Sequence, residues 1–224
     1  GIGKALIGAA IDHARSLNIF EAYLYAQTHA LDFYRKEGFI VHGDEFFEAN
    51  IPHFTMRLAL FNQRLLGKHY GTFVVQNYKS SVKDLVSQTK QKLLILSSDL
   101  DSYVFNTNEI VDYISSLARK SRYTETRILV TDTTTMVKQG HRLLELQRRL
   151  SSRISIRKIS IEPHLIRHNL VISDNVGFIC QSVNDPEKAW GNYNNIPTAR
   201  NYMTEFNEYW GQALEDSDLN VLAI

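Results

Sequence analysis

The chain has 224 residues, 44% of them hydrophobic and 22% charged, and a formal net charge of +1 at pH 7. These values are typical of a globular protein with one large or two small domains, and they lack the basic excess of a dedicated nucleic-acid binder. No apolar run approaches the roughly 18 residues of a membrane span. Cys180 is the only cysteine, which excludes an intrachain disulfide and a zinc cluster. No charged-then-apolar leader is visible, so we expect a cytoplasmic protein.

The chain begins directly with a helical pattern. Apolar side chains recur at steps of three and four residues from Ile2 to Leu17, and Gly1 and Gly3 stand at the start. Such a helix is usually preceded by a strand and a turn, and the chain has no initiator Met. We therefore expect a fragment of a longer protein.

Further elements follow this helix. The pattern predicts the strand 19–26, the helix 28–36 closed by Gly38 in a left-handed C-cap, and the strands 39–41 and 53–60 joined by a loop that contains Pro52. Periodicity is weak afterwards, and Gly67 and Gly71 interrupt it. The sequence thus predicts a first domain at 1–60, a linker at 61–79 and a second domain at 80–224.

The second domain alternates between strands and helices, which argues for an α/β layered fold. Asn106 and Glu109 have the spacing of a capping box. Pro197 occupies a favoured first-turn position. The expected elements are the helices 80–90 and 108–120, a helix through Leu143, Leu146 and Leu150, a final helix from Pro197, and the strands 93–97, 127–131, 154–161, 169–173 and 177–180.

The glycines at the helix start suggest a site for a phosphate. Free backbone N–H groups and the positive end of the helix dipole favour an anion there, and glycine allows its close approach. A tight turn into an amphipathic helix explains the same two glycines equally simply.

The order of residues in the first 60 positions resembles the GNAT superfamily of N-acetyltransferases, and within it the ElaA-type branch. A strand ending in Ala-Gln leads to a helix with Phe-Tyr and Gly-Phe, then to an acidic stretch and Ile-Pro-His. The residues that carry the resemblance are Gly1, Gly3, Ala26, Gln27, Phe33, Tyr34, Gly38, Phe39, Glu45, Glu48, Ile51, Pro52, His53 and Met56.

The resemblance implies acetyl-CoA as co-substrate and a role for seven residues. The amides of Ile2, Gly3, Lys4 and Ala5, after Gly1, would hold the CoA pyrophosphate. Gln27 would contact the pantetheine arm. Tyr34 would protonate the departing CoA thiolate, since a phenol of pKa near 10 can supply that proton; the alternative for Tyr34 is packing beside Phe33.

The acceptor side is less defined. Glu45, Glu48 and His53 are candidates for contacting the attacking amine or acting as its base, although a solvated loop is the simpler interpretation. The superfamily's first four strands would precede residue 1. We expect the intact protein to be an acetyltransferase, and these residues alone to lack half of the active site.

The segment 167–184 resembles the HKD hairpin of the phospholipase D superfamily. Aligned on Asp174, the family's His and Lys positions hold Arg167 and Asn169, and its Gly position holds Gln181. Ser182 and Asn184 fit the pattern; using His168 instead places Asp174 one residue too early. Because the nucleophile and its cationic partner are absent, the resemblance implies a phospholipase-D-like domain without catalysis. An ordinary hairpin in an unrelated α/β domain is the alternative.

A basic run could hold a phosphate or a nucleic-acid backbone, but a solvated helix face plus an edge strand is the simpler interpretation. Its members are Arg142, Arg148, Arg149, Arg153, Arg157, Lys158 and Arg167. His141, which follows Gly140, is expected to start a helix, and no trio of His, Asp and Glu has the spacing of a metal site.

Two functions remain open. The first is an N-acetyltransferase acting on an amine-bearing small molecule or peptide. The second is a non-catalytic phospholipase-D-like module that recognises an anionic or phosphate-containing partner. Neither a membrane nor a nucleic acid is expected as partner, and a homodimer is a candidate assembly.

Overall fold

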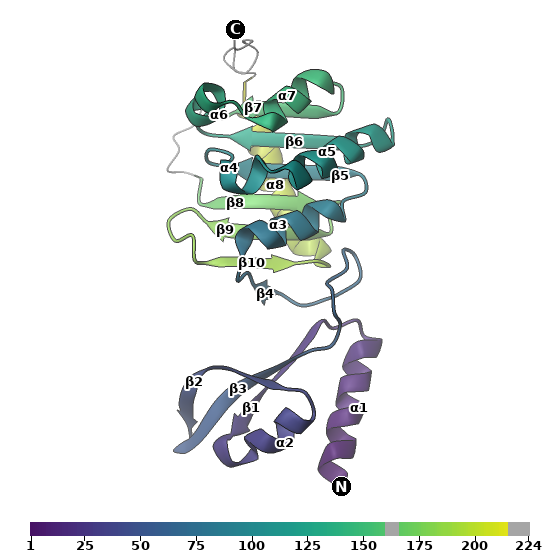
Figure 1. Ribbon diagram of the computed structural model, residues 1–224, viewed down its shortest axis with the longest axis vertical. Helices are drawn as coiled ribbons and strands as arrows, with labels where there is room; N and C mark the ends of the chain where they lie inside the picture. The colour runs from purple at the N-terminus through teal and green to yellow at the C-terminus, as the bar shows by residue number, and fades with distance from the viewer. Residues whose placement is uncertain (160–165, 215–224) are drawn as a thin grey trace. The chain divides into compact units, whose positions relative to one another are not determined.

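The computed structural model describes residues 1–159 and 166–214. The chain forms two compact units, Gly1–Gly71 and Thr72–Ile224 (Figure 1). The segment 61–71 belongs to the first unit: Phe61 stacks on His69 with ring centroids 4.2 Å apart, and the amide of Tyr70 donates to the carbonyl of Asn18. The domain limits derived from the sequence stay a prediction.

The first unit is a three-stranded antiparallel sheet with its helices on one face. The strand order is β1-β3-β2. Its elements are α1 (Ile2–Ser16), β1 (Glu21–Gln27), the short helix η1 (Thr28–Ala30), α2 (Leu31–Lys36), β2 (Ile40–Glu48) and β3 (Ile51–Ala59).

The core of this unit lies between the helices and one sheet face. Ala26, Leu31, Phe39 and Met56 are buried there, and side chains of α1 pack against them. Alternation along the strands leaves the other face of β1 open, where Tyr23 and Tyr25 are 67% and 56% exposed. Burial of one face only is the usual pattern of an antiparallel sheet.

The second hairpin of this unit is longer than predicted. β2 runs to Glu48, a register shift between His42 and Phe46 marks a bulge, and Ala49 and Asn50 form the turn with φ of 49° and 60°. Pro52 therefore lies in β3, opposite Phe47, and the predicted loop is wrong. The bulge disturbs the alternation of side chains, which hides the strand in the sequence.

The second unit is a seven-stranded mixed sheet, with strand order β4-β10-β9-β8-β5-β6-β7. β5, β6 and β7 are parallel, and the other pairs are antiparallel. The strands are β4 (Phe73–Val74), β5 (Lys92–Ser97), β6 (Glu125–Val130), β7 (Ile154–Lys158), β8 (His168–Ser173), β9 (Gly177–Ser182) and β10 (Ala189–Asn192). The predicted strand 154–161 thus ends at Lys158, and its residues 160 and 161 lie outside the described part of the chain.

Helices cover both faces of this sheet, as Figure 1 shows with α8 behind the strands and the others in front. Phe206 of α8 is fully buried against β8 and β9, as the pattern of apolar residues from Pro197 onwards predicts. An α/β layered unit is therefore confirmed. The helices are α3 (Tyr78–Ser87), α4 (Ser102–Phe105), α5 (Asn108–Lys120), α6 (Thr134–Gln139), α7 (Arg142–Arg149) and α8 (Ile196–Gln212).

The cap of α5 differs from the prediction by one residue. Thr107, not Asn106, is the N-cap, and its hydroxyl accepts from the amide of Ile110 at 3.4 Å. Asn106 instead accepts from the amide of Arg142 at 2.9 Å, which joins α5 to the start of α7. A side chain that can cap two nearby helices is ambiguous in sequence.

Candidate functional site

The N-terminus of α1 has no side-chain cap among the described residues. Gly1 is the N-cap, no side chain caps the helix, and the first turn contains no acidic residue. The amide of Ala5 donates to the carbonyl of Gly1 at 3.3 Å and so closes the first turn. The amides of Ile2, Gly3 and Lys4 precede this bond, and they are the donors that a helix leaves without an internal partner. The arrangement can hold an anion.

The start of α1 lies against α2. A Cβ on Gly3 would lie 3.4 Å from Cζ of Phe33, so the phenyl ring borders the first turn of α1. The ring of Tyr34 meets Phe33 edge-on with centroids 5.0 Å apart, and it also meets Phe39 at 6.0 Å. Tyr34 is half-buried over the core of the unit. The packing beside Phe33, the alternative interpretation of Tyr34, is thus present, and Phe33 connects the ring of Tyr34 to the first turn of α1.

Gln27 and Lys4 have contacts of their own. Gln27 is the last residue of β1, is half-buried and pairs with His53 of β3. The Nζ atom of Lys4 lies 3.5 Å from a carboxylate oxygen of Glu37, just after α2. This ion pair links the two helices that border the glycine turn.

The acceptor-side candidates lie in strands rather than in a loop, although Glu45 and Glu48 are exposed to solvent, as the simpler interpretation has it. A carboxylate oxygen of Glu45 accepts from the hydroxyl of Thr28 at 2.9 Å. His53 is 7% exposed, and its Nδ1 lies 2.8 Å from the carbonyl oxygen of Ile51. Because a carbonyl only accepts, Nδ1 is the donor of this hydrogen bond. Glu48 ends β2 and pairs with Ile51.

In the second unit, Asp174 holds the β8–β9 turn to the start of β5. Its carboxylate accepts from the backbone amides of Lys90, Gln91 and Lys92 at 2.8, 2.8 and 2.9 Å. Asp174 has a φ of 52°, in the left-handed region that Asp tolerates better than most residues. The role of this carboxylate is structural.

The other residues of the β8–β9 hairpin that carry the phospholipase D resemblance lie apart from one another. Arg167 is exposed and is not among the residues that line the nearby cavity, whereas Asn169 lines it. Ser182 accepts from the amide of Asp185 at 3.2 Å, and Asn184 is exposed. His168 lies on the α8 side of the sheet, edge-on to Trp190 at 5.6 Å. The hairpin therefore does not gather these side chains into one site.

A cavity of about 460 Å³ lies at the carboxyl end of β5. Its floor is a chain of amides: Asn169 accepts from the amide of Ser98 at 3.1 Å and donates to Gln181 at 3.4 Å, and Gln181 donates to the carbonyl of Pro186 at 2.9 Å. The lining residues are Asn77, Tyr78, Lys79, Ser97, Asp99, Asp101, Tyr103, Val104, Phe105, Asn169, Gln181 and Pro186.

The sequence reasoning missed the charged wall of this cavity. Asp99 and Asp101 directly follow the buried strand β5, and Lys79 and Tyr103 come from α3 and α4. Polar residues at the carboxyl end of a buried parallel strand are the usual sequence signal of a site in an open α/β sheet. That signal was present in the stretch that follows Ser97.

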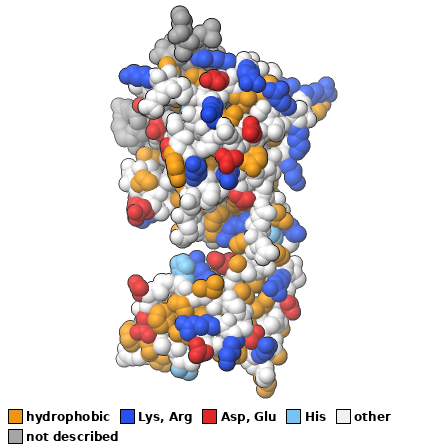
Figure 2. All heavy atoms as spheres, in the orientation of Figure 1, with side chains coloured by type: hydrophobic (Ala, Val, Ile, Leu, Met, Phe, Trp, Pro, Cys, Tyr) orange, Lys and Arg blue, Asp and Glu red, His pale blue; other side chains and the backbone are white. Residues whose placement is uncertain are grey.

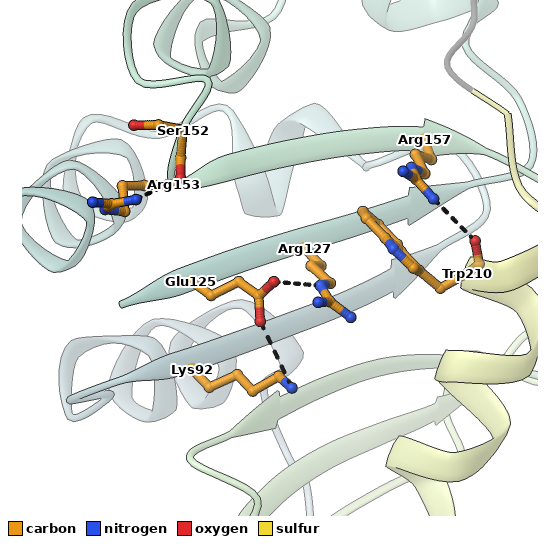
Figure 3. Close-up of polar contacts among 7 residues, drawn as sticks. All are labelled: Lys92, Glu125, Arg127, Ser152, Arg153, Arg157 and Trp210. Atoms are coloured by element: carbon orange, nitrogen blue, oxygen red, sulfur yellow. Dashed lines mark hydrogen bonds and ion pairs between the residues drawn. The ribbon is translucent and has the colours of Figure 1, made fainter. Parts of the chain in front are cut away.

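The basic run lies mostly on α7 and on the edge strand β7, as the simpler interpretation predicted. Arg157 lies with its guanidinium 4.6 Å from the Trp210 ring and donates to the Trp210 carbonyl, while Arg153, at the other end of β7, donates to Ser152 (Figure 3). β7 is an edge strand. On the face shown in Figure 2, basic and acidic side chains are intermixed.

Arg127, a second arginine beside Trp210, is partly neutralised by a neighbouring carboxylate. Arg127 lies 5.2 Å from the same ring, and its Nε atom is 2.5 Å from a carboxylate oxygen of Glu125, which also pairs with Lys92 at 3.7 Å. Charges paired within a sheet face attract a further anion weakly. This face is therefore a poorer candidate for phosphate than its basic residues suggest.

His141 is the N-cap of α7, as predicted, and its Nδ1 accepts from the amide of Leu143 at 3.2 Å. Burial lowers the pKa of His141 to about 4, so the ring is neutral at pH 7. Among the described residues, no group of three or more His, Cys, Asp or Glu side chains could hold a metal ion. No helix in residues 1–159 and 166–214 is long and apolar enough to cross a bilayer.

Several solved structures are similar to the chain at low identity, among them the following three. The archaeal chromatin protein TrmBL2, with a novel mode of DNA binding, has a TM-score of 0.48 at 13% identity over 65% of this chain and 54% of its own. Nuc, a phospholipase D family member from Salmonella typhimurium, has 0.46 at 14% over 66% and 96%. Phosphatidylserine synthase from Haemophilus influenzae has 0.47 at 13% over 83% and 46%. The chain spans about half of the first and third proteins.

Two family models match the chain. Residues 1–60 match the acetyltransferase (GNAT) domain, and residues 75–222 match a domain of unknown function, DUF7931. No curated protein matches. The predicted GNAT domain is confirmed, and the C-terminal region has a distant structural similarity to Nuc, a phospholipase D family member. The chain belongs to the DUF7931 family and carries a GNAT acetyltransferase domain at residues 1–60.

Proposed function

We propose that the protein is an N-acetyltransferase that transfers the acetyl group of acetyl-CoA to the amine of a small molecule or peptide. The observation that carries this proposal is the uncapped first turn of α1 beside Phe33 and Tyr34, inside the part of the chain that matches a GNAT domain. Backbone donors, a close-approach glycine and a phenol then lie within one small region.

The donor would bind through its pyrophosphate at the start of α1. The amides of Ile2, Gly3 and Lys4 would donate to the phosphate oxygens, and the positive end of the helix dipole would favour their charge. Gly1 and Gly3 would allow this approach. In the proposal Ala5 closes the turn rather than supplying a free donor, because its amide already donates to Gly1.

Chemistry would follow at the thioester. The amine nitrogen attacks the carbonyl carbon, the carbon–sulfur bond breaks, and Tyr34 gives its phenolic proton to the departing thiolate. Nε2 of His53 would take the proton from the amine, because Nδ1 is committed to Ile51. Gln27 would orient the pantetheine arm from the end of β1.

Thiol release from acetyl-CoA over a panel of amines tests the proposal with the native gene product. We expect release that depends on one class of amine and that falls strongly in Tyr34→Phe but not in Tyr113→Phe, a matched change on the exposed side of α5. Release that never exceeds the hydrolysis of acetyl-CoA in buffer would contradict the proposal.

The second function considered from sequence, recognition of an anionic partner by the C-terminal unit, has weaker support. Arg167, which stands at the family's His position, is outside the cavity lining, and Asp99 and Asp101 line that cavity instead. Two carboxylates repel a phosphate.

A further inference from the structure

We propose that the cavity at the carboxyl end of β5 binds an alkylammonium group, from a small amine or a lysine side chain, between the Tyr103 ring and the carboxylates of Asp99 and Asp101. The proposal is independent of acetyl transfer, because it concerns only residues of the C-terminal unit.

The charges of the lining favour a cation. Asp99 and Asp101 both line the cavity, and Lys79 is the only basic side chain among the lining residues. Asp101 uses one carboxylate oxygen to accept from the amide of Tyr103 at 2.9 Å. Asp99 is exposed, and within the described residues it has no ion-pair or hydrogen-bond partner. An unpaired carboxylate beside a concave surface attracts ammonium groups and repels phosphate.

Lys79 already shows how an ammonium fits this wall. Its Nζ atom lies 3.9 Å from the centroid of the Tyr103 ring, within the range of a cation–π interaction. Tyr103 is 68% exposed, so the ring is open to a second molecule as well. We interpret Lys79 as a tethered occupant that competes with an incoming ammonium.

A buried hydroxyl belongs to one of the lining residues. Tyr78 lines the cavity, and its Oη atom is buried without a hydrogen-bond partner among the described residues. Burial raises the pKa of Tyr78, so the hydroxyl stays neutral and protonated. A buried polar atom without a partner is costly, and the oxygen can accept a hydrogen bond from an N–H group.

The floor of the cavity offers a phosphate few donors. The amide nitrogen of Asn169 donates to Gln181, and that of Gln181 donates to Pro186. Each amide therefore commits one of its two N–H groups inside the protein. The carboxylates of Asp99 and Asp101 are less engaged, since in the described part of the chain only that of Asp101 accepts a hydrogen bond, from the amide of Tyr103.

Titration of the full chain with n-butylammonium, followed by amide NMR at constant ionic strength, tests this proposal. We expect shifts in the segments that contribute to the lining, and none with n-butanol, the neutral analogue. Asp99→Asn should weaken binding several-fold, whereas Lys79→Met should strengthen it roughly threefold or more, because the tethered competitor on the ring is gone. Asp112→Asn and Lys120→Met, at exposed positions of α5, are the matched controls.

The effect of Lys79→Met distinguishes a cation site from an anion site, because removal of Lys79 should strengthen the binding of a cation and weaken the binding of an anion. If inorganic phosphate binds the cavity and Lys79→Met abolishes that binding, Lys79 is an anion anchor and the proposal is overturned. Absence of butylammonium binding in both wild type and Lys79→Met also overturns it. The source of the group is then read from two further probes: tighter binding of 1,4-diaminobutane supports a free amine, and tighter binding of a blocked Gly-Lys-Gly peptide supports a lysine side chain.

Discussion

Replacement of Asp174 by alanine should destabilise the C-terminal unit strongly. The carboxylate accepts from three backbone amides that lie more than 80 residues away in sequence, at Lys90, Gln91 and Lys92. Hydrogen bonds to a charged group contribute about 1.5–3 kcal/mol each, but three bonds to one partly exposed carboxylate are not additive. We take about 3 kcal/mol for the set.

Backbone strain adds to this loss. Asp174 has a φ of 52°, where alanine costs about 1 kcal/mol or more. The sum is about 4 kcal/mol, and a domain of about 150 residues loses roughly 2–4 °C of Tm for each kcal/mol. Asp174→Ala should therefore lower the Tm of this unit by about 8–16 °C. Asp174→Asn keeps one carbonyl oxygen and tolerates the same φ, so it should lose about half as much.

Calorimetry of the full chain checks these values, with Asp112→Asn as an exposed control of the same charge change. A change below about 1 °C in Asp174→Ala, within the effect of an ordinary surface substitution, would refute the structural role given to this carboxylate.

Three further predictions follow from the same contacts. In the native gene product, Tyr34→Phe should lower the acetyl-transfer rate about 10²-fold, as loss of a general acid does, and leave the Kd of acetyl-CoA unchanged in calorimetry. Burial lowers the pKa of His141 to about 4, below the value of about 6.5 in the unfolded chain. The unfolded chain therefore takes up the proton first, and the free energy of unfolding should fall as the pH drops from 6.5 to 4. In urea unfolding, His141→Asn, which can still cap α7, should flatten that pH dependence. Gly191→Ala would place its Cβ 2.5 Å from Cδ1 of Ile179 and 3.1 Å from a backbone oxygen, and it should lower the free energy of unfolding by roughly 1–3 kcal/mol. Gly211→Ala, with open space around its Cβ, should not lower it. A urea midpoint for Gly191→Ala equal to that of the wild type would contradict this packing.

Elements with strong local patterns could be predicted from the sequence. β5 is a continuous apolar run that is buried on both faces, and α5 repeats buried residues at Ile110, Ile114 and Leu117. The C-cap after α2 was also predictable, since Gly38 has a φ of 91°. In each case a few neighbouring residues determine the conformation.

Elements that depend on distant partners could not be predicted. β4 has only two residues, and its pairing is with β10, more than 100 residues later. The bulge in β2 interrupts its alternation. The cavity wall joins Lys79 with Asp99 and Tyr103 from separate elements, so no local spacing announces it. The glycine turn of α1, by contrast, lies in the same continuous segment, residues 1–60, as the other residues that carry the GNAT resemblance.

The central claim, that acetyl-CoA binds through its pyrophosphate at the start of α1, is tested most directly by calorimetry of Gly3→Asp. A carboxylate in the first turn stabilises the helix, and the space beside Gly3 admits a Cβ at 3.4 Å from Phe33, so the unit should stay folded. Gly8→Asp, in the same helix with open space around its Cβ, is the control. The account predicts that acetyl-CoA binds more tightly than acetyl-pantetheine, and that Gly3→Asp, but not Gly8→Asp, removes this difference. Equal affinity for the two donors in the wild type, or an unchanged difference in Gly3→Asp, would contradict it.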